Sequence, residues 1–506
     1  MTADLPVELY TAAQVRELDR IAIKEQSLSS LTLMERAGAD AFEVLRVRYP
    51  DAKRLLVLCG GGNNAGDGYV LARLAHQEGR VVRVSALVAP ERLTGEAATC
   101  ARHYLQTGAV ASTFAPDGAD VIVDALLGSG LNRIVDGAFA DAIRRVNESG
   151  IPTLALDLPS GLNADTGVCM GSTIRAAATI AFVGLKRGLF TAQGPEFCGD
   201  VLFSDLDTPA TARASVNAGV RLIEHQEVAH NLPCRTRDAH KGHHGHVLVV
   251  GGDDGYQGAA LLAACAAARS GAGLVTVATR PEHARIVPLY QPELMSAAVH
   301  TAQDLDTLLN RVSVVAIGPG LGQSDWAGAL LAKVLQTRLP LVVDADALNL
   351  LASEPQRRAN WVLTPHPGEA ARLLGVTTAE LQADRFAAVS LLQDKFGGVV
   401  VLKGAGSLIA AAGGPLYLNP TGNPGMAAGG MGDVLTGIIA GLLAQGLAPP
   451  AAARCGVYLH GHAADLCAAQ GERGLLAGDL LPMLRTLVNP AHHPAHYLGH
   501  HPAPCA

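Results

Sequence analysis

Short apolar runs that do not alternate with polar residues recur along the whole chain. They lie at 54–59, 81–88, 121–124 and 153–157 in the first half, and at 247–250, 274–279, 312–317, 341–344, 361–364 and 399–402 in the second. Such runs are typical of parallel strands that helices cover on both faces. The pattern therefore predicts an α/β protein with buried, mostly parallel sheets in both halves.

Helical periods separate these runs. Residues 11–26 begin at Thr11, a preferred N-cap, and a second predicted helix ends before Pro50. We expect residues 60–68, which are rich in glycine and asparagine, to form a loop that leads into a helix at 69–76. An apolar helix is predicted at 434–443, after another glycine-rich loop.

The length of 506 residues favours two domains over one. The pattern loosens between about residues 207 and 237, so we place domains at 1–218 and 219–490 and expect residues 491–506 to be a disordered tail rich in proline and histidine. The domains differ in their loops and show no internal repeat.

Composition and charge exclude several classes of function. Apolar residues make up 49% of the chain and the net charge is −7 without a long basic run, which argues against nucleic acid as a partner. No apolar segment reaches the roughly 20 residues that a membrane span needs, so no membrane partner is expected. The nine cysteines form no CxxC pair, which fits reduced thiols and a cytoplasmic location. No Asp, Glu or Cys completes a ligand set with the histidines at 240–246, so a loop is predicted there and not a metal site.

Polar side chains follow three predicted strands of the first half. Asn64, Asp124, Asp157 and Ser160 all lie at carboxyl ends of strands, which share one edge of a parallel sheet. We therefore expect them to converge, although an aspartate after a strand is individually more often a cap or turn residue. Oxygen ligands of this kind suit a hard cation and not zinc.

The second half contains a candidate phosphate site at Asn419–Gly437. Glycines 429, 430 and 432 allow close backbone approach, and the following helix start leaves unpaired N–H groups that attract an anion. Asp433 would repel a phosphate, but it is well placed as a base for the group that attacks one. The residues alone therefore predict phosphoryl chemistry with Asp433 as base.

The motifs GGGNNAGDGYVLARLA, VDALLGSGL and ALDLPSGLNADTG resemble the NAD(P)H-hydrate epimerase family over roughly residues 10–215. The resemblance implies a Rossmann-like three-layer αβα domain and a potassium ion bound by Asn64, Asp124 and Ser160. It also implies a substrate pocket formed by Asn63, Asn64, Ala65, Gly66, Asp67, Gly128, Ser129, Gly130, Leu131, Asn132, Arg133, Ile134 and Asp157. Ala65 replaces a glycine common in the family, and we expect no loss of function. Asp157 is our candidate catalytic acid or base, because epimerisation requires proton transfer near the hydroxyl-bearing carbon.

The motifs GPGLG, DADALN, LTPHPGE, VLKGAGS and NPGMAAGGMGDVLTG resemble the ADP-dependent NAD(P)H-hydrate dehydratase family over about residues 235–485. That family has a ribokinase-like fold. The resemblance implies substrate contacts at Ala259, Gly320, His366 and Asp433, and nucleotide contacts at Lys403, Gly404, Ala405, Gly406, Ser407 and Gly432.

Together the two resemblances imply an enzyme that repairs hydrated NADH and NADPH, NADHX and NADPHX. One domain would interconvert the R and S epimers, and the other would dehydrate the S form with conversion of ADP to AMP and phosphate. Mg²⁺ is expected with the nucleotide and a homo-oligomer is expected. Two alternatives stay open here: a ribokinase-like kinase of a vitamin alcohol fused to a non-catalytic Rossmann-like domain, and a first half that is only a scaffold in an RNA-processing assembly.

Overall fold

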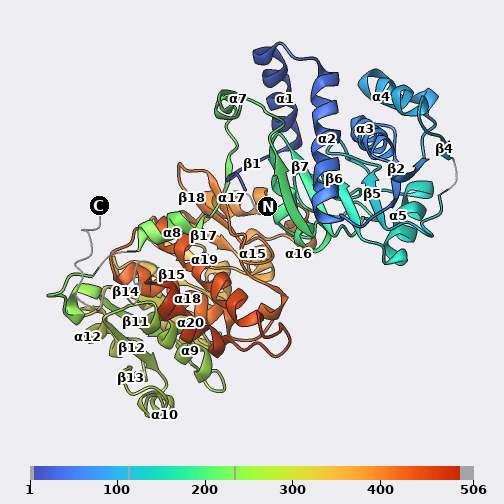
Figure 1. Cartoon of the computed structure of the whole chain (residues 1–506). Coiled ribbons are helices and arrows are strands. Elements are labelled where there is room, and N and C mark those ends of the chain that lie inside the picture. Colours follow the sequence, from blue (N-terminus) through green and yellow to red (C-terminus); the bar gives the residue numbers. More distant parts are fainter. Residues whose placement is uncertain (1–4, 112–113, 233–234, 490–506) are drawn as a thin grey trace. The chain divides into compact units, whose positions relative to one another are not determined.

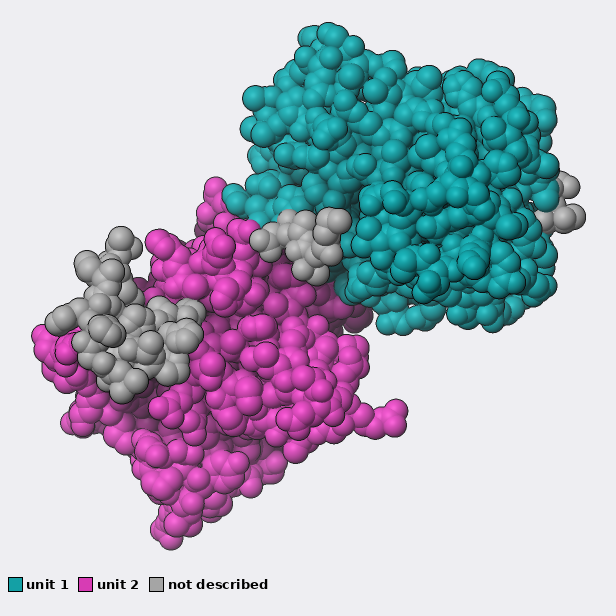
Figure 2. All heavy atoms as spheres, in the orientation of Figure 1, with its two compact units in different colours: residues 1–221 teal, residues 222–506 magenta. Residues whose placement is uncertain are grey.

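A computed structural model of the chain describes residues 5–111, 114–232 and 235–489 (Figure 1). The chain divides into two compact units, Met1–Arg221 and Leu222–Ala506 (Figure 2). The predicted tail at 491–506 lies outside the described residues. Helices and parallel strands alternate in both units, so the predicted α/β class is confirmed.

A seven-stranded sheet forms the middle layer of unit 1. Its order is β4 (Val110–Ala111), β3 (Val81–Ala86), β2 (Arg54–Cys59), β5 (Val121–Ala125), β6 (Thr153–Leu156), β7 (Ala178–Phe182) and β9 (Asp200–Ser204), and each neighbouring pair is parallel. Successive residues of β2 point to opposite faces, so Leu55 and Val57 join one buried cluster and Leu56 and Leu58 another.

Helices cover both faces of that sheet. The cluster around Leu55 contains residues of α1 (Ala12–Gln26), α2 (Ser30–Arg48), α3 (Asn63–Gln77) and α4 (Gly95–Leu105), and the cluster around Leu56 contains residues of α5 (Gly137–Ser149). This is the predicted three-layer arrangement. Thr11 caps α1 as expected, since its side chain accepts a hydrogen bond from the Gln14 amide. The short β1 (Glu8–Tyr10) pairs with β8 (Leu185–Lys186) and with β10 (Val220–Leu222).

Unit 2 is built on a second, mostly parallel sheet. Nine of its strands follow the order β13 (Met295–Ala298), β12 (Leu274–Thr279), β11 (His246–Val250), β14 (Val314–Ile317), β15 (Leu341–Val343), β16 (Trp361–Leu363), β17 (Val399–Leu402), β18 (Leu408–Ala411) and β19 (Leu416–Leu418). Only the pairs that involve β18 are antiparallel. The main helices are α9 (Gln257–Arg269), α13 (Asp325–Leu335), α14 (Ala345–Ser353), α15 (Pro367–Leu374), α17 (Arg385–Phe396), α18 (Met431–Ala444), α19 (Pro449–Ala468) and α20 (Leu480–Leu487).

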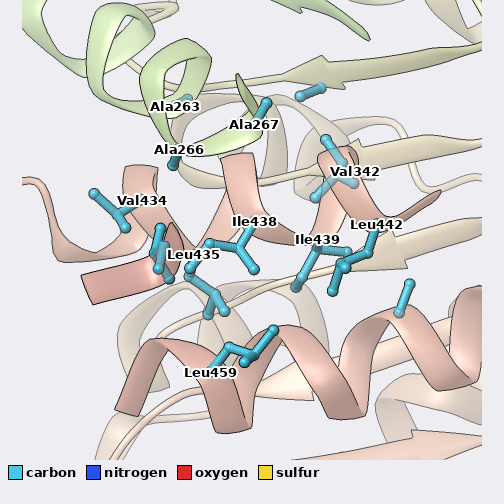
Figure 3. Packing of buried hydrophobic residues seen from close by; sticks show 14 of the residues in the cluster. Ala263, Ala266, Ala267, Val342, Val434, Leu435, Ile438, Ile439, Leu442 and Leu459 are labelled. Atoms are coloured by element: carbon cyan, nitrogen blue, oxygen red, sulfur yellow. The ribbon is translucent and has the colours of Figure 1, made fainter. Parts of the chain in front are cut away.

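Helix α18 lies at the centre of the unit 2 core. Val434, Leu435, Ile438 and Ile439 pack among α9, the sheet and α19 (Figure 3). The alanine-rich face of α9 allows a close approach of the two helices. An added Cβ on Gly437 would lie 2.0 Å from the carbonyl oxygen of Ala263. The burial on all sides of α18 fixes the position of its N-terminus, and with it Asp433.

Two sequence-based boundaries are wrong. The stretch expected to be a loop at 60–68 becomes helical at Asn63, and α18 begins at Met431, so Asp433 lies inside its first turn. Glycines 66 and 68 are therefore helical. An added Cβ on Gly68 would lie 2.5 Å from that of Ala125, so its role is close packing against the sheet. None of the helices within the described ranges is long and apolar enough to span a membrane.

Candidate functional site

A cavity of about 970 Å³ opens at the carboxyl ends of the unit 1 strands. Most of the predicted pocket residues line it, namely Asn63, Asn64, Asp67, Gly128, Ser129, Gly130, Leu131, Asn132, Arg133 and Asp157. Three predicted members are not among its lining residues. Ala65 and Gly66 are buried inside α3, and Ile134 is a surface residue with 68% of its area exposed.

The structure brings Asn64, Asp124 and Ser160 together around Leu127. The Asn64 amide donates to the Leu127 carbonyl at 3.1 Å, and the Leu127 amide donates to Ser160 Oγ at 2.8 Å. Ser160 in turn donates through its hydroxyl (2.6 Å) and its backbone amide (2.8 Å) to the Asp124 carboxylate. Residues nearly 100 positions apart in sequence thus form one polar cluster at the cavity wall.

This cluster has the properties of a cation site. Asp124 is fully buried, and burial raises its pKa to about 6 although Ser160 and the Leu126 amide stabilise the charged form. Asn64 Oδ1 is also buried and has no hydrogen-bond partner. A buried carboxylate and an orphaned amide oxygen both gain from a hard cation, so these donors fit a cation of that class.

The cavity also contains a buried lysine, Lys186, that the sequence did not lead us to predict. Lys186 has only 1% of its side chain exposed, and its ammonium donates to Asp157 and to the Phe182 carbonyl. Asp19 and Asp67 face the same pair, and burial raises the pKa of Asp19 to about 6 and that of Asp67 well above its ordinary value. A lysine within the apolar segment 178–189 was the available signal.

The polar loops of unit 2 also meet. Lys403 Nζ lies 2.8 Å from Asp344 Oδ1, and Thr436 of α18 donates to the other Asp344 oxygen at 2.8 Å. Glu369 lies 4.0 Å from the same ammonium. His366 caps α15 by accepting from the Gly368 amide, and its Nε2 is 3.3 Å from Glu369. The carboxyl ends of β15, β16 and β17 therefore converge on Lys403.

Acidic groups outnumber basic ones at this point. Burial, followed by repulsion from Asp344, raises the pKa of Asp433 to about 7. Burial likewise raises the pKa of Glu369 to about 7. Burial disfavours the charged form of Lys403, but Asp344 and Glu369 outweigh it and raise the pKa of that ammonium. Asp433 is therefore a carboxylate whose proton affinity suits a general base near neutral pH.

The loop at 403–407 is held from beneath by a buried arginine. Arg385 donates to the carbonyls of Leu402, Lys403 and Gly406, and Gly404 has a φ of +140°. A Cβ at Gly404 would lie 2.7 Å from that guanidinium, so only glycine fits. Gly432 faces the same place, because its added Cβ would lie 3.2 Å from Lys403 Nζ. Partly exposed loop backbone and a helix start meet here, an arrangement that can bind an anionic ligand.

Ala259 and Gly320 are neighbours, since an added Cβ on Gly320 would lie 3.2 Å from that of Ala259. The Gly320 carbonyl accepts from the Asp253 amide at 2.6 Å, which ties the loop after β14 to the loop before α9.

The loop predicted at 240–246 contains a short 3-10 helix, Lys241–His244. The rings of His240 and His243 stack there with their centroids 3.7 Å apart. No cluster of three or more His, Cys, Asp or Glu suited to a metal occurs among residues 5–111, 114–232 and 235–489.

Four side chains of the unit 2 site lay outside the predicted set: Asp344, Glu369, Thr436 and Arg385. The first two stand in the quoted motifs DADALN and LTPHPGE, so the signal was available. Arg385 belongs to α17 and had no such signal, because its contacts with the 403–407 loop depend on tertiary packing.

Comparison with known proteins identifies relatives for both units. Residues 247–485 match the family model described as NAD(P)H-hydrate dehydratase, and residues 30–188 match that described as YjeF-related protein N-terminus. The bifunctional NAD(P)H-hydrate repair enzyme Nnr of Coxiella burnetii is 51% identical over 487 residues, which are 95% of this chain and 99% of the relative. The enzyme of the same name from Escherichia coli is 44% identical, over 96% of this chain and 95% of the relative. A ribokinase-like superfamily protein of Enterococcus faecalis is 32% identical with a TM-score of 0.50, over 54% of this chain and 96% of that structure.

Proposed function

This chain belongs to the family of bifunctional NAD(P)H-hydrate repair enzymes, and on that premise we propose which residues of each unit carry out the repair. The first unit is the epimerase and the second the dehydratase. Hydrated nicotinamide nucleotides exist as two epimers, and a dehydratase that accepts one of them leaves the other to accumulate. An epimerase in the same chain makes the whole pool available.

The unit 1 cavity takes the hydrated nucleotide, with its ring beside Asp157. Asn64, Asp124 and Ser160 would hold potassium, which supplies positive charge next to the substrate when bound. The orphaned, buried Asn64 Oδ1 supports this assignment. Asp157 accepts or supplies the proton that moves during epimerisation.

In unit 2, Asp433 removes the proton of the ring hydroxyl, and the resulting oxygen attacks the terminal phosphate of ADP. The unpaired amides at the start of α18 and the Lys403 ammonium stabilise the charge that develops on that phosphate. The carbon–oxygen bond then breaks with help from the lone pair of the ring nitrogen, and phosphate departs. Loss of a proton from the neighbouring ring carbon forms the carbon–carbon double bond. The products are NADH or NADPH, AMP and phosphate. These steps make unit 1 an isomerase and unit 2 a lyase.

The nucleotide would contact Lys403, Gly404, Ala405, Gly406, Ser407 and Gly432, and the hydrate would contact Ala259, Gly320, His366 and Asp433. Mg²⁺ would accompany the nucleotide and offset phosphate charge when bound. Asp344 and Glu369 supply oxygen donors of the kind that Mg²⁺ prefers, but Lys403 already pairs with both. We therefore assign the ion to the nucleotide and to no protein residue.

The observation that carries this proposal is Asp433, with its raised pKa, in the first turn of α18 beside the Lys403–Asp344 pair. The test incubates the chain with both NADHX epimers and either ADP or ATP. We expect NADH to form beyond the share of one epimer, with one phosphate released per NADH. Asp433→Ala should abolish both. Phosphate release that continues in step with hydrate consumption in this variant would refute the assignment.

The family relationship favours repair over the vitamin-alcohol kinase, whose product would be a stable phosphorylated alcohol. It also favours a catalytic first unit over a scaffold, and Asn64, Asp124, Asp157 and Ser160 are all present. The cytoplasmic location and the homo-oligomer stay predictions.

A further inference from the structure

Lys186 is the most deeply buried cation of the unit 1 cavity. It ends β8, its side chain is 1% exposed, and its ammonium donates to Asp157 and, at 3.0 Å, to the Phe182 carbonyl. Both members of the pair line the cavity. An ammonium is costly to bury, and this one contacts the same carboxylate that we assign to proton transfer.

Backbone geometry holds the partner in an unusual conformation. Asp157 follows β6 with a φ of +68°, in the left-handed region that residues other than glycine rarely adopt. Its amide donates to the Ile180 carbonyl at 2.8 Å, which locks that conformation to β7. This backbone conformation, which the fold maintains, directs the carboxylate toward Lys186.

Two further carboxylates, Asp19 and Asp67, interact electrostatically with the Lys186–Asp157 pair, and Arg16 interacts with Asp19. Arg20, Glu96 and Arg133 also line the cavity. Burial favours the neutral forms of Asp19 and Asp67. The Lys186 ammonium and the Asp157 carboxylate lie in contact, so one point of the cavity wall offers both a proton donor and a proton acceptor.

The substrate chemistry needs both at once. Water adds to the dihydronicotinamide ring at a carbon bonded to the ring nitrogen, so the hydrate is a carbinolamine. Its configuration can be lost when the carbon–nitrogen bond breaks, the hydroxyl becomes an aldehyde and the ring recloses on the other face. Opening requires removal of the hydroxyl proton and delivery of a proton to the departing nitrogen.

We propose that Lys186 and Asp157 are the acid and base of this ring opening, an inference that rests on the proposed epimerase function. Asp157 takes the hydroxyl proton as the carbon–oxygen double bond forms, and the Lys186 ammonium gives a proton to the ring nitrogen as the carbon–nitrogen bond breaks. The protonated Asp157 and neutral Lys186 then exchange that proton through their shared hydrogen bond. After rotation of the aldehyde the nitrogen attacks its other face, loses its proton to the pair, and the new hydroxyl takes one up. No oxidant or other reactant is needed.

The decisive variants are Lys186→Arg and Lys186→Met. Arginine keeps the positive charge beside Asp157 but holds its proton too tightly to donate it, whereas methionine removes the charge. We expect the kcat of epimerisation to fall at least 100-fold in both, with at most a few-fold change in substrate KM. Lys53→Arg, an exposed lysine outside the cavity, is the matched control and should epimerise as the parent does.

The dehydration rate of the same chain on the S epimer gives the concentration of active protein, and thermal unfolding of unit 1 reports its folding. An arginine variant that binds substrate and epimerises within threefold of the parent chain would overturn the proposal. If both variants fail to fold, a solvent-isotope measurement on the parent chain tests the proposal instead. Transfer of two protons in one step predicts a curved dependence of kcat on the deuterium fraction of the solvent. A linear dependence would contradict a joint role of Lys186 and Asp157.

The position of deuterium in the product gives a further check. Ring opening predicts that the carbon-bound hydrogens are retained when R-NADHX is epimerised in D₂O. Incorporation of deuterium at carbon in step with epimerisation would refute it. A parent chain that does not accelerate epimerisation over the protein-free rate would instead disprove the proposed function of unit 1.

Discussion

Asp120 and Asp433 carry the same side chain, yet their surroundings move its pKa in opposite directions. Asp120 lies on the surface, where hydrogen bonds from the Arg54 side chain and from backbone amides hold its pKa below the ordinary value. Burial and the nearby Asp344 raise that of Asp433 to about 7. Only the second carboxylate can both accept and return a proton near neutral pH.

The raised pKa of Asp433 gives the dehydratase a predictable pH dependence. A general base acts in its ionised form, so kcat/KM for S-NADHX should fall about tenfold per pH unit below pH 7 and level off above it. The measurement follows NADH formation at subsaturating substrate between pH 5.5 and 9, with ADP held in excess. A profile that is flat from pH 5.5 to 7.5 would contradict the role of Asp433.

Asn64 provides the corresponding test for potassium. Because its Oδ1 is buried without a partner, K⁺ should raise the Tm of unit 1 and accelerate epimerisation, whereas Li⁺ should do neither. Asn64→Ala should weaken the K⁺-dependent rise in Tm at least tenfold in concentration. Asn147→Ala, whose side chain bonds the Thr173 carbonyl, is the control and should keep the K⁺ response. An Asn64→Ala protein that responds to K⁺ as the parent does would exclude this ligand.

At the scale of elements, glycine was the residue that sequence reasoning interpreted least well. A stretch with glycines at 60, 61, 62, 66 and 68 predicts a turn on local grounds. Within it, Gly66 and Gly68 are instead helical. A Cβ on Gly66 would lie 2.2 Å from Met34 Sδ and one on Gly68 would meet Ala125, so both glycines serve close packing. Whether a glycine serves a turn or close packing depends on a partner distant in sequence.

Gly437 of α18 and Gly258 of α9 compare a tightly packed helical glycine with one that has open space around it. Gly437→Ala should destabilise unit 2 by about 1–3 kcal/mol or more, since the new methyl would lie 2.0 Å from a backbone oxygen. Gly258→Ala in α9 meets nothing within 4 Å and should be neutral or stabilising by up to about 1 kcal/mol. Denaturant unfolding of both variants measures the difference. Equal stabilities would show that α18 can shift away from α9.

The strands and the polar loops after them could be predicted, because buried parallel strands are continuous apolar runs and their carboxyl ends share an edge. The convergence of Asn64, Asp124 and Ser160 followed from that geometry. The pairing of Lys186 with Asp157, and the support of the 403–407 loop by Arg385, could not be predicted. Both depend on side-chain placement across elements that the chain pattern leaves undetermined.

At the scale of the whole molecule, each reaction is assigned to residues of one unit. The epimerase residues all precede Arg221, and the dehydratase residues all follow Leu222. Each unit therefore contains a separate set of residues for its own reaction, and the S epimer is the only species the two must share. A small, soluble nucleotide can pass between them through solvent.

This separation predicts that two half-inactive chains complement each other. Asp157→Asn should convert only the S share of a mixture of epimers within the time of the assay, and Asp433→Ala should convert neither epimer to NADH. An equimolar mixture of the two proteins with ADP should consume the whole pool, because the S epimer released by one chain diffuses to the other. Spontaneous epimerisation, measured without protein, sets the background. If the R share persists in the mixture while the parent chain consumes it, the epimer is not released between the two reactions, and the units must then be joined for repair to go to completion.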